Sequence, residues 1–169
     1  MRLLLITLTI TAAPLLASPA AAQNVAGAFS KGRTHFVVSG GAGYAFNNTY
    51  LVLGLGGAYY LLDGLNVGVH VESWSGSSPS MYKATPSVQY VFHNTTVAKP
   101  YLGAFYRRTF ISDRPDLDSA GARAGAYFEA GRNAYIGAGV VYESYLDCNQ
   151  TVYRSCSGTY GELSFTVAF

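Results

Sequence analysis

The sequence predicts an all-β protein, an eight-stranded antiparallel transmembrane up-and-down β-barrel that follows a cleavable signal peptide. Three observations predict this fold: an apolar N-terminal segment with the features of an export signal, eight later segments in which apolar and polar residues alternate, and a final segment with one fully apolar face. Alternation with a period of two is typical of a strand with one face in apolar surroundings and the other against polar groups.

The final segment, Thr159 to Phe169, shows this alternation most clearly. Leu163, Phe165, Val167 and Phe169 share one face, and the residues between them are polar or small or present a hydroxyl. An apolar strand at an open sheet edge promotes aggregation, whereas a closed barrel in a bilayer pairs every strand. We therefore expect this strand to close a membrane barrel, and its four apolar residues to act as the assembly signal.

Residues 1–22 predict a signal peptide, and residues 23–169 a single outer-membrane β-barrel domain. Met1-Arg2 carries positive charge, an apolar stretch follows, and small residues up to Ala22 fit a cleavage site. The alternative is a membrane-spanning helix, but the apolar stretch is short and contains Pro14. No later segment approaches the ~20 continuous apolar residues of a spanning helix.

The composition agrees with a small barrel. Hydrophobic residues make up 50% of the chain but are scattered, and the sequence contains 19 Gly, 14 Tyr and 9 Phe. Glycine and aromatic residues suit strands around a narrow barrel with rings at the membrane interfaces. The net charge of +2 is too small to indicate a nucleic-acid partner, and no basic patch with interleaved aromatics occurs.

Each alternating segment has about the ~9–11 residues that a tilted strand needs to cross a membrane. Between the second and third of them, Asp63-Gly64 is a strong tight-turn signal. In order, the predicted strands are residues 35–46, 50–61, 65–74, 81–92, 101–111, 120–128, 134–146 and 159–169. An even number of strands places both chain ends on the periplasmic side. The links expected to face outward are residues 47–49, 75–80, 112–118 and 147–157.

One residue conflicts with this pattern. Pro86 lies inside the fourth predicted strand. Proline cannot donate a ladder hydrogen bond, and a closed barrel has no free edge at which to place it. We therefore expect a β-bulge or a local adjustment of register at Pro86.

Polar residues that alternate with the lipid-facing set must point into the lumen, which in an eight-stranded barrel is only wide enough for side chains. Both signs of charge occur there in similar numbers, and buried charges are tolerated when paired. We expect Arg123→Ala to leave a buried carboxylate unpaired. The predicted polar network of the lumen consists of His70, Glu72, Lys83, Arg107, Arg123, Glu143 and Glu162.

A catalytic use of this lumen is the sharper alternative. Catalysis requires a nucleophile beside a base that a third group orients. His70 and Glu72 share a strand face, and Ser87 and Ser164 also point inward. Because any polar lumen supplies such combinations, the spacing is not diagnostic. We expect that the protein is not an enzyme, and we assign no catalytic residue, metal ligand or cofactor.

Cys148 and Cys156 are the only cysteines in the sequence. In an exported protein an even number of cysteines indicates a disulfide. This disulfide would close a small loop in the last outer link and contribute ~2–4 kcal/mol. A metal site needs more ligands than these two, and the three histidines lie far away in the sequence.

Five segments carry a resemblance to a known family: residues 60–68 (YLLDGLNVG), 88–92 (VQYVF), 99–104 (KPYLGA), 121–128 (GARAGAYF) and 161–169. With them the chain resembles the small eight-stranded outer-membrane barrels of Gram-negative bacteria, in the opacity-protein and OmpX/OmpA-barrel superfamily. The resemblance implies location in the bacterial outer membrane, contact with its lipid, and insertion by the barrel-assembly machinery. It also implies a role in envelope integrity, adhesion or host interaction, through a host or envelope ligand that the sequence does not identify.

Two departures narrow these roles. The predicted outer loops are short, which weakens an adhesin interpretation, and the His-x-Ser motif of the lipid A deacylase barrels is absent. We expect a monomeric outer-membrane barrel with a structural or surface-interacting role and a closed polar interior. The first alternative is a narrow or gated small-solute channel, and the second is a lipid-modifying outer-membrane enzyme.

Overall fold

The structure is a computed structural model that describes residues 27–45, 48–146 and 156–169. The predicted signal peptide lies outside the described residues. Within these ranges no helix has the length and apolar character needed to cross a membrane.

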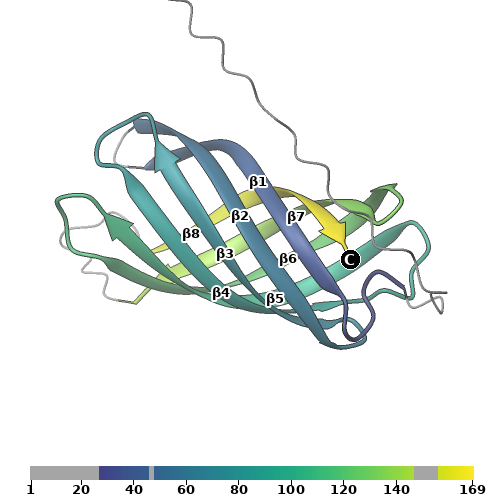
Figure 1. Cartoon of the computed structure of the whole chain (residues 1–169). Coiled ribbons are helices and arrows are strands. Elements are labelled where there is room, and N and C mark those ends of the chain that lie inside the picture. The colour runs from purple at the N-terminus through teal and green to yellow at the C-terminus, as the bar shows by residue number, and fades with distance from the viewer. Residues whose placement is uncertain (1–26, 46–47, 147–155) are drawn as a thin grey trace, which may run out of the picture.

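Eight antiparallel strands form a closed barrel in which each strand pairs with its neighbours in the sequence, and β8 returns to β1 (Figure 1). Every predicted strand is confirmed, with ends that differ by three residues or fewer. The strands are β1 (Thr34–Ala45), β2 (Asn48–Leu62), β3 (Leu65–Ser75), β4 (Met81–Val91), β5 (Ala98–Ile111), β6 (Leu117–Gly131), β7 (Ala134–Tyr145) and β8 (Ser157–Ala168).

The closure between β1 and β8 is short. It consists of four paired positions, from His35–Ala168 to Val38–Phe165, and of backbone hydrogen bonds between Thr34 and Phe169. Each of the other seven ladders pairs nine or more positions. Beyond Val38, β1 therefore stays paired with β2 along one edge, whereas its ladder with β8 along the other edge has ended. We call the facing edges there, residues 39–45 of β1 and 158–164 of β8, the seam, because the ladder between the described residues of these two strands does not extend along them.

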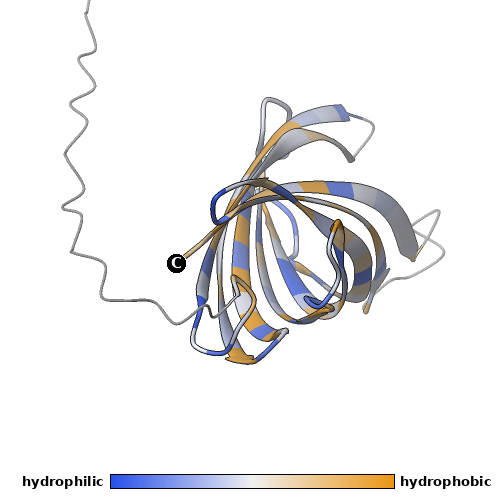
Figure 2. Ribbon diagram, turned by 90° about the vertical axis from the view of Figure 1, so that its right-hand side faces the viewer, coloured by the Kyte–Doolittle hydropathy of each residue, from blue (hydrophilic) through white to orange (hydrophobic). Residues whose placement is uncertain are grey.

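The outer wall is apolar because outward positions on every strand follow the predicted alternation, and Figure 2 shows apolar residues recurring along the strands. On β5, Leu102 and Tyr106 face outward whereas Phe105 and Arg107 are buried. Exposed apolar residues of the wall include Leu51, Leu53, Leu55, Val67, Val69, Val71, Leu102, Tyr106, Phe110, Ile136, Val140, Tyr142, Leu163 and Phe165.

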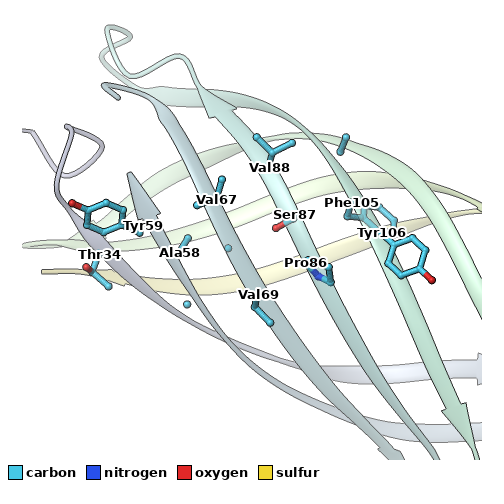
Figure 3. Close-up of a pocket in the computed structure, with 13 residues that line it drawn as sticks. Thr34, Ala58, Tyr59, Val67, Val69, Pro86, Ser87, Val88, Phe105 and Tyr106 are labelled. Atoms are coloured by element: carbon cyan, nitrogen blue, oxygen red, sulfur yellow. The ribbon is translucent and has the colours of Figure 1, made fainter. Parts of the chain in front are cut away.

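The expectation of a bulge or register adjustment at Pro86 is wrong. Pro86 pairs in register with Val69 on β3, whereas its ladder with β5 is interrupted at Thr85 and Pro86. The register is the same on both sides of this gap, from Ala84–Arg108 to Ser87–Phe105. The missing N–H of proline therefore costs ladder bonds locally, but it does not shift the strands. Pro86 lines a shallow apolar groove on the outer wall (Figure 3).

A short N-terminal segment closes one rim of the barrel. Phe29 is only 2% exposed, and its ring contacts the rings of His35, Tyr60, Tyr127 and Tyr135 at centroid distances of 4.9–6.0 Å. We call residues 27–33 the plug, and the rim that they close, where the chain turns at 63–64, 92–97 and 132–133, the plugged rim. The opposite rim, with links at 76–80 and 112–116, is the loop rim.

Backbone hydrogen bonds hold the plug in place. The Gly32 amide donates to the Tyr60 carbonyl, the Tyr60 amide donates to the Arg33 carbonyl, and the Gly64 amide donates to the Phe29 carbonyl, all at 2.8–2.9 Å. His35 Nε2 donates to the carbonyl of Ala28 at 2.8 Å. Burial of Phe29 is thus coupled to the strands that surround it.

Aromatic residues at the plugged rim fall into two groups with different roles. Those on the outer wall agree with a girdle at a membrane interface. Those that turn inward pack with the plug instead, which the alternation in the sequence did not separate from the girdle. The outward group is Tyr59, Tyr90, Phe92 and Phe128, and the inward group is Tyr60, Tyr101 and Tyr135.

Replacing Phe29 tests the plug. We expect Phe29→Ala to release the segment, because a buried phenylalanine typically contributes ~3–5 kcal/mol. Hydrogen exchange at the amides of Gly32 and Gly64 should then become fast, whereas Phe92→Ala, which removes an exposed ring at the same rim, should leave both amides protected. Equal protection in Phe29→Ala and the parent would show that the plug does not depend on this ring.

Candidate functional site in the lumen

The centre of the lumen is organised by one buried arginine. Arg107 Nη1 donates to Glu143 Oε2 at 2.9 Å and to the hydroxyl of Tyr160 at 2.6 Å, and its Nε donates to Thr85 Oγ1 at 3.0 Å. Ser119 Oγ donates to Glu143 Oε1 at 2.5 Å. The Arg107 and Glu143 side chains are 4% and 3% exposed. Such a buried pair is tolerated because its remaining donors and acceptors are also satisfied.

Glu72 extends this cluster toward the loop rim. Its Oε1 lies 3.9 Å from Arg107 Nη2 and 3.5 Å from His70 Nδ1, and its Oε2 accepts a hydrogen bond from Trp74 Nε1 at 3.0 Å. Lys83 lies at the paired position on β4, with its Nζ 3.7 Å from the centre of the Trp74 ring. The carboxylate is therefore held by several donors and by two nearby cations.

A second ion pair fills the lumen closer to the plugged rim. Arg123 Nη1 lies 3.4 Å from Glu162 Oε2, and the hydroxyl of Tyr101 donates to Glu162 Oε1 at 2.9 Å. The Arg123 and Glu162 side chains are 18% and 22% exposed. The guanidinium groups of Arg107 and Arg123 each lie 5.0 Å from the ring of Phe105, so this ring separates the two ion clusters.

All seven residues of the predicted polar network point into the lumen, and the structure divides them into two clusters. Among these residues three cations match three carboxylates, so the network is neutral apart from His70. Within the described residues no group of three or more His, Cys, Asp or Glu side chains is arranged to hold a metal ion. The first cluster is His70, Glu72, Lys83, Arg107 and Glu143, and the second is Arg123 and Glu162.

His70 has a further partner that the sequence did not single out. Ser39 Oγ, on β1, lies 3.2 Å from His70 Nε2. The contact reaches across β2, where Gly54 lies between Ser39 and Glu72 in the register. Ser87 and Ser164, the two serines considered from the sequence, pair instead with Gly68 and Gly137.

Two glycines on β2 explain how this contact forms. A Cβ on Gly54 would lie 2.7 Å from His70 Cε1, and a Cβ on Gly56 would lie 2.6 Å from His70 Cδ2. Only glycine at both positions lets the imidazole lie across β2 and reach β1. The glycines of β2, which pair with Ser39, His70 and Glu72, were the available signal in the sequence. Glycine recurs on so many of the strands that this signal was not distinctive.

The predicted disulfide remains a prediction. Cys148 lies outside the described residues, as does most of the link between β7 and β8. The described part of this link includes Cys156, whose carbonyl accepts a hydrogen bond from the Tyr145 amide at 3.0 Å.

The chain is similar to solved outer-membrane barrels. The N-terminal β-barrel domain of OprF from Pseudomonas aeruginosa matches with 15% identity and a TM-score of 0.65, covering 82% of this chain and 98% of that one. Neisserial surface protein A matches with 19% identity and a TM-score of 0.52, covering 80% and 93%. No protein-family model matches the sequence, and no curated relative does.

These likenesses show the fold, that of the small eight-stranded outer-membrane barrels. The apolar outer wall and the charged interior are what a bilayer requires of such a fold. The chain is thus an outer-membrane β-barrel protein, and neither likeness identifies its particular role.

Three arginines test the energetic ranking of the ion pairs. We expect Arg107→Ala to cost the most, ~3–5 kcal/mol, because it strands the buried carboxylate of Glu143. Arg123→Ala should cost less, because its pair is partly exposed. Arg108→Ala is the control, since Arg108 is 48% exposed and pairs with Asp116, and exposed pairs contribute ~0–1 kcal/mol.

Urea unfolding of the barrels in lipid vesicles, followed by gel mobility, measures the three differences. Equal midpoints for Arg107→Ala and Arg108→Ala would contradict the assignment of Arg107 as the centre of the lumen network.

Proposed function

We propose that the protein is an integral outer-membrane barrel with a closed polar interior and a structural or surface-interacting role in the cell envelope. The observation that carries this proposal is the filling of the lumen at three levels. The plug occupies the plugged rim, the Arg123–Glu162 pair lies next along the barrel axis, and the cluster around Arg107 lies nearer the loop rim. Among the described residues, packed rings or paired charges therefore occupy each of these three levels.

The outer wall supports contact with lipid around the barrel. Leu163, Phe165 and Phe169 are exposed on the outward side of the final strand. The barrel-assembly machinery would recognise them there during insertion. In the proposed orientation the plugged rim faces the periplasm and the loop rim faces outward. The links of the loop rim at 76–80 and 112–116 are short, which favours a structural role over binding of a large ligand.

Planar-bilayer recording of the refolded protein tests the closed interior. We expect no stable unitary currents, because ions would have to pass both the Phe29 plug and two paired-charge clusters. A matched recording with a known open porin establishes that insertion succeeds under the same conditions. Stable unitary steps from the parent protein would overturn the proposal and favour the alternative of a small-solute channel.

The envelope role has its own test in a deletion strain. We expect loss of the protein to increase sensitivity to detergents and to large antibiotics that an intact outer membrane excludes. Complementation with the parent should restore resistance, and complementation with Arg107→Ala should restore it only to the extent that the variant accumulates as a folded barrel. Unchanged sensitivity in the deletion strain would remove the structural role.

A further inference from the structure

We propose that Ser39 is a nucleophile that His70 activates, with Glu72 orienting the imidazole of His70. Its target is the ester carbonyl that links an acyl chain to a membrane lipid, bound at the seam. This inference goes beyond the envelope role and does not depend on it. It departs from our sequence-based expectation that the protein is not an enzyme, because the sequence did not show that Ser39 and His70 meet.

The atoms in contact are those that the chemistry needs. Ser39 Oγ lies 3.2 Å from His70 Nε2, while His70 Nδ1 lies 3.5 Å from Glu72 Oε1. A carboxylate at Nδ1 favours the tautomer with its proton on Nδ1, which leaves Nε2 free to accept the serine proton. Trp74 Nε1 holds the other oxygen of Glu72 at 3.0 Å, so the carboxylate that orients the imidazole is itself fixed.

The local backbone is shaped around the imidazole. Gly54 and Gly56 provide the recess in which His70 lies, because a Cβ at either position would come within 2.6–2.8 Å of its ring. Ser39, His70 and Glu72 are half-buried rather than sealed. A packing role alone does not call for two glycines that turn a basic nitrogen toward a hydroxyl.

Ser39 is also the first residue of β1 beyond its ladder with β8, and so it lies at the edge of the seam. Thr34 and Phe169 exchange backbone hydrogen bonds, and antiparallel ladders alternate in direction. Gly40, six residues after Thr34, therefore directs its N–H toward the seam, where the described residues of β8 no longer pair with it. An N–H from the residue after the nucleophile is one of the donors that stabilise the oxyanion in serine hydrolases.

The seam also determines the class of substrate. Unpaired backbone groups at membrane depth are strongly unfavourable unless a polar group forms a hydrogen bond with them. Leu163 and Val38 are exposed on the two sides of the seam, so an acyl chain can lie against the wall while its ester carbonyl reaches the free backbone. An acyl ester of a membrane lipid has both the apolar chain that packs against the wall and the carbonyl that accepts from the backbone. A polar solute in water has only the second of these.

The reaction is a balanced acyl transfer. Ser39 Oγ attacks the ester carbonyl carbon and its proton passes to His70 Nε2, while the Gly40 N–H faces the developing oxyanion. The bond between carbon and the alcohol oxygen then breaks, and the alcohol leaves with the proton from Nε2. A water molecule attacks the acyl-serine in the same way, which releases the fatty acid and restores Ser39.

Covalent labelling tests the nucleophile directly. The full barrel, refolded in detergent micelles, is exposed to a fluorescent alkyl fluorophosphonate, from which the serine oxygen displaces fluoride. We expect labelling at Ser39, confirmed by peptide mass, with no label in Ser39→Ala and a loss of about a hundredfold or more in His70→Gln. Gly54→Ala should also slow labelling by displacing the imidazole.

Ser164→Ala is the matched control, because Ser164 is a half-buried inward serine on the other edge of the seam, and it should label at the parental rate. Gel mobility before and after heating checks that each variant is folded. The proposal is overturned if the folded parent labels no faster than the unfolded chain, or if Ser39→Ala labels as fast as the parent.

A second arm tests the lipid part. The parent and Ser39→Ala are reconstituted in vesicles of phosphatidylethanolamine and phosphatidylglycerol, and free fatty acid is measured. We expect release from the parent only. Labelling of Ser39 by the fluorophosphonate without release of fatty acid would contradict membrane lipid as the source of the ester.

Discussion

In a bilayer every backbone N–H and C=O must find a partner within the protein, and this constraint shapes the whole molecule. It requires the eight strands to close, and closure with eight strands leaves a lumen that only side chains fill. The same constraint makes the junction between β1 and β8 exceptional. There the ladder ends after Val38 and Phe165, so this is the part of the wall where polar groups from outside the chain would find backbone partners.

The narrow lumen in turn determines its electrostatics. Charges that point inward have little water around them, so each must be matched by a charge or by hydrogen bonds. The structure achieves this with two clusters separated by the ring of Phe105. The plug and the two clusters together occupy the interior at three levels along the barrel axis, and within the first cluster the His70 imidazole contacts the hydroxyl of Ser39.

The fold could be predicted because a strand with one apolar face shows apolar residues at every second position of its sequence. Leu53 and Leu55, for instance, alternate with glycines along β2, and no other regular structure places them on one face. The inward positions of His70 and the six charged residues of the lumen followed for the same reason. Pro86 was misjudged because the sequence shows that a donor is missing, but not whether the neighbouring strand will shift to compensate.

The alternation of residues does not predict contacts between strands that are not adjacent in the sequence. Ser39 and His70 meet only because β2 between them carries glycine at two positions, and the meaning of those glycines depends on the register. Phe29 lies before the first strand, where periodicity gives no information, so the plug was not predicted. In both cases the alternation shows which way a side chain points but not what it touches.

Spin labels placed along β3 test most directly whether the wall is in lipid. Single nitroxides at 67, 69 and 71 should collide readily with oxygen, which concentrates in the bilayer, and should be shielded from a water-soluble nickel chelate. Nitroxides at 66, 68 and 70 should show lower collision rates with oxygen, so that oxygen accessibility alternates with a period of two. Equal access of the chelate to all six positions, or oxygen accessibility without alternation, would contradict a closed barrel with an apolar outside and a polar inside.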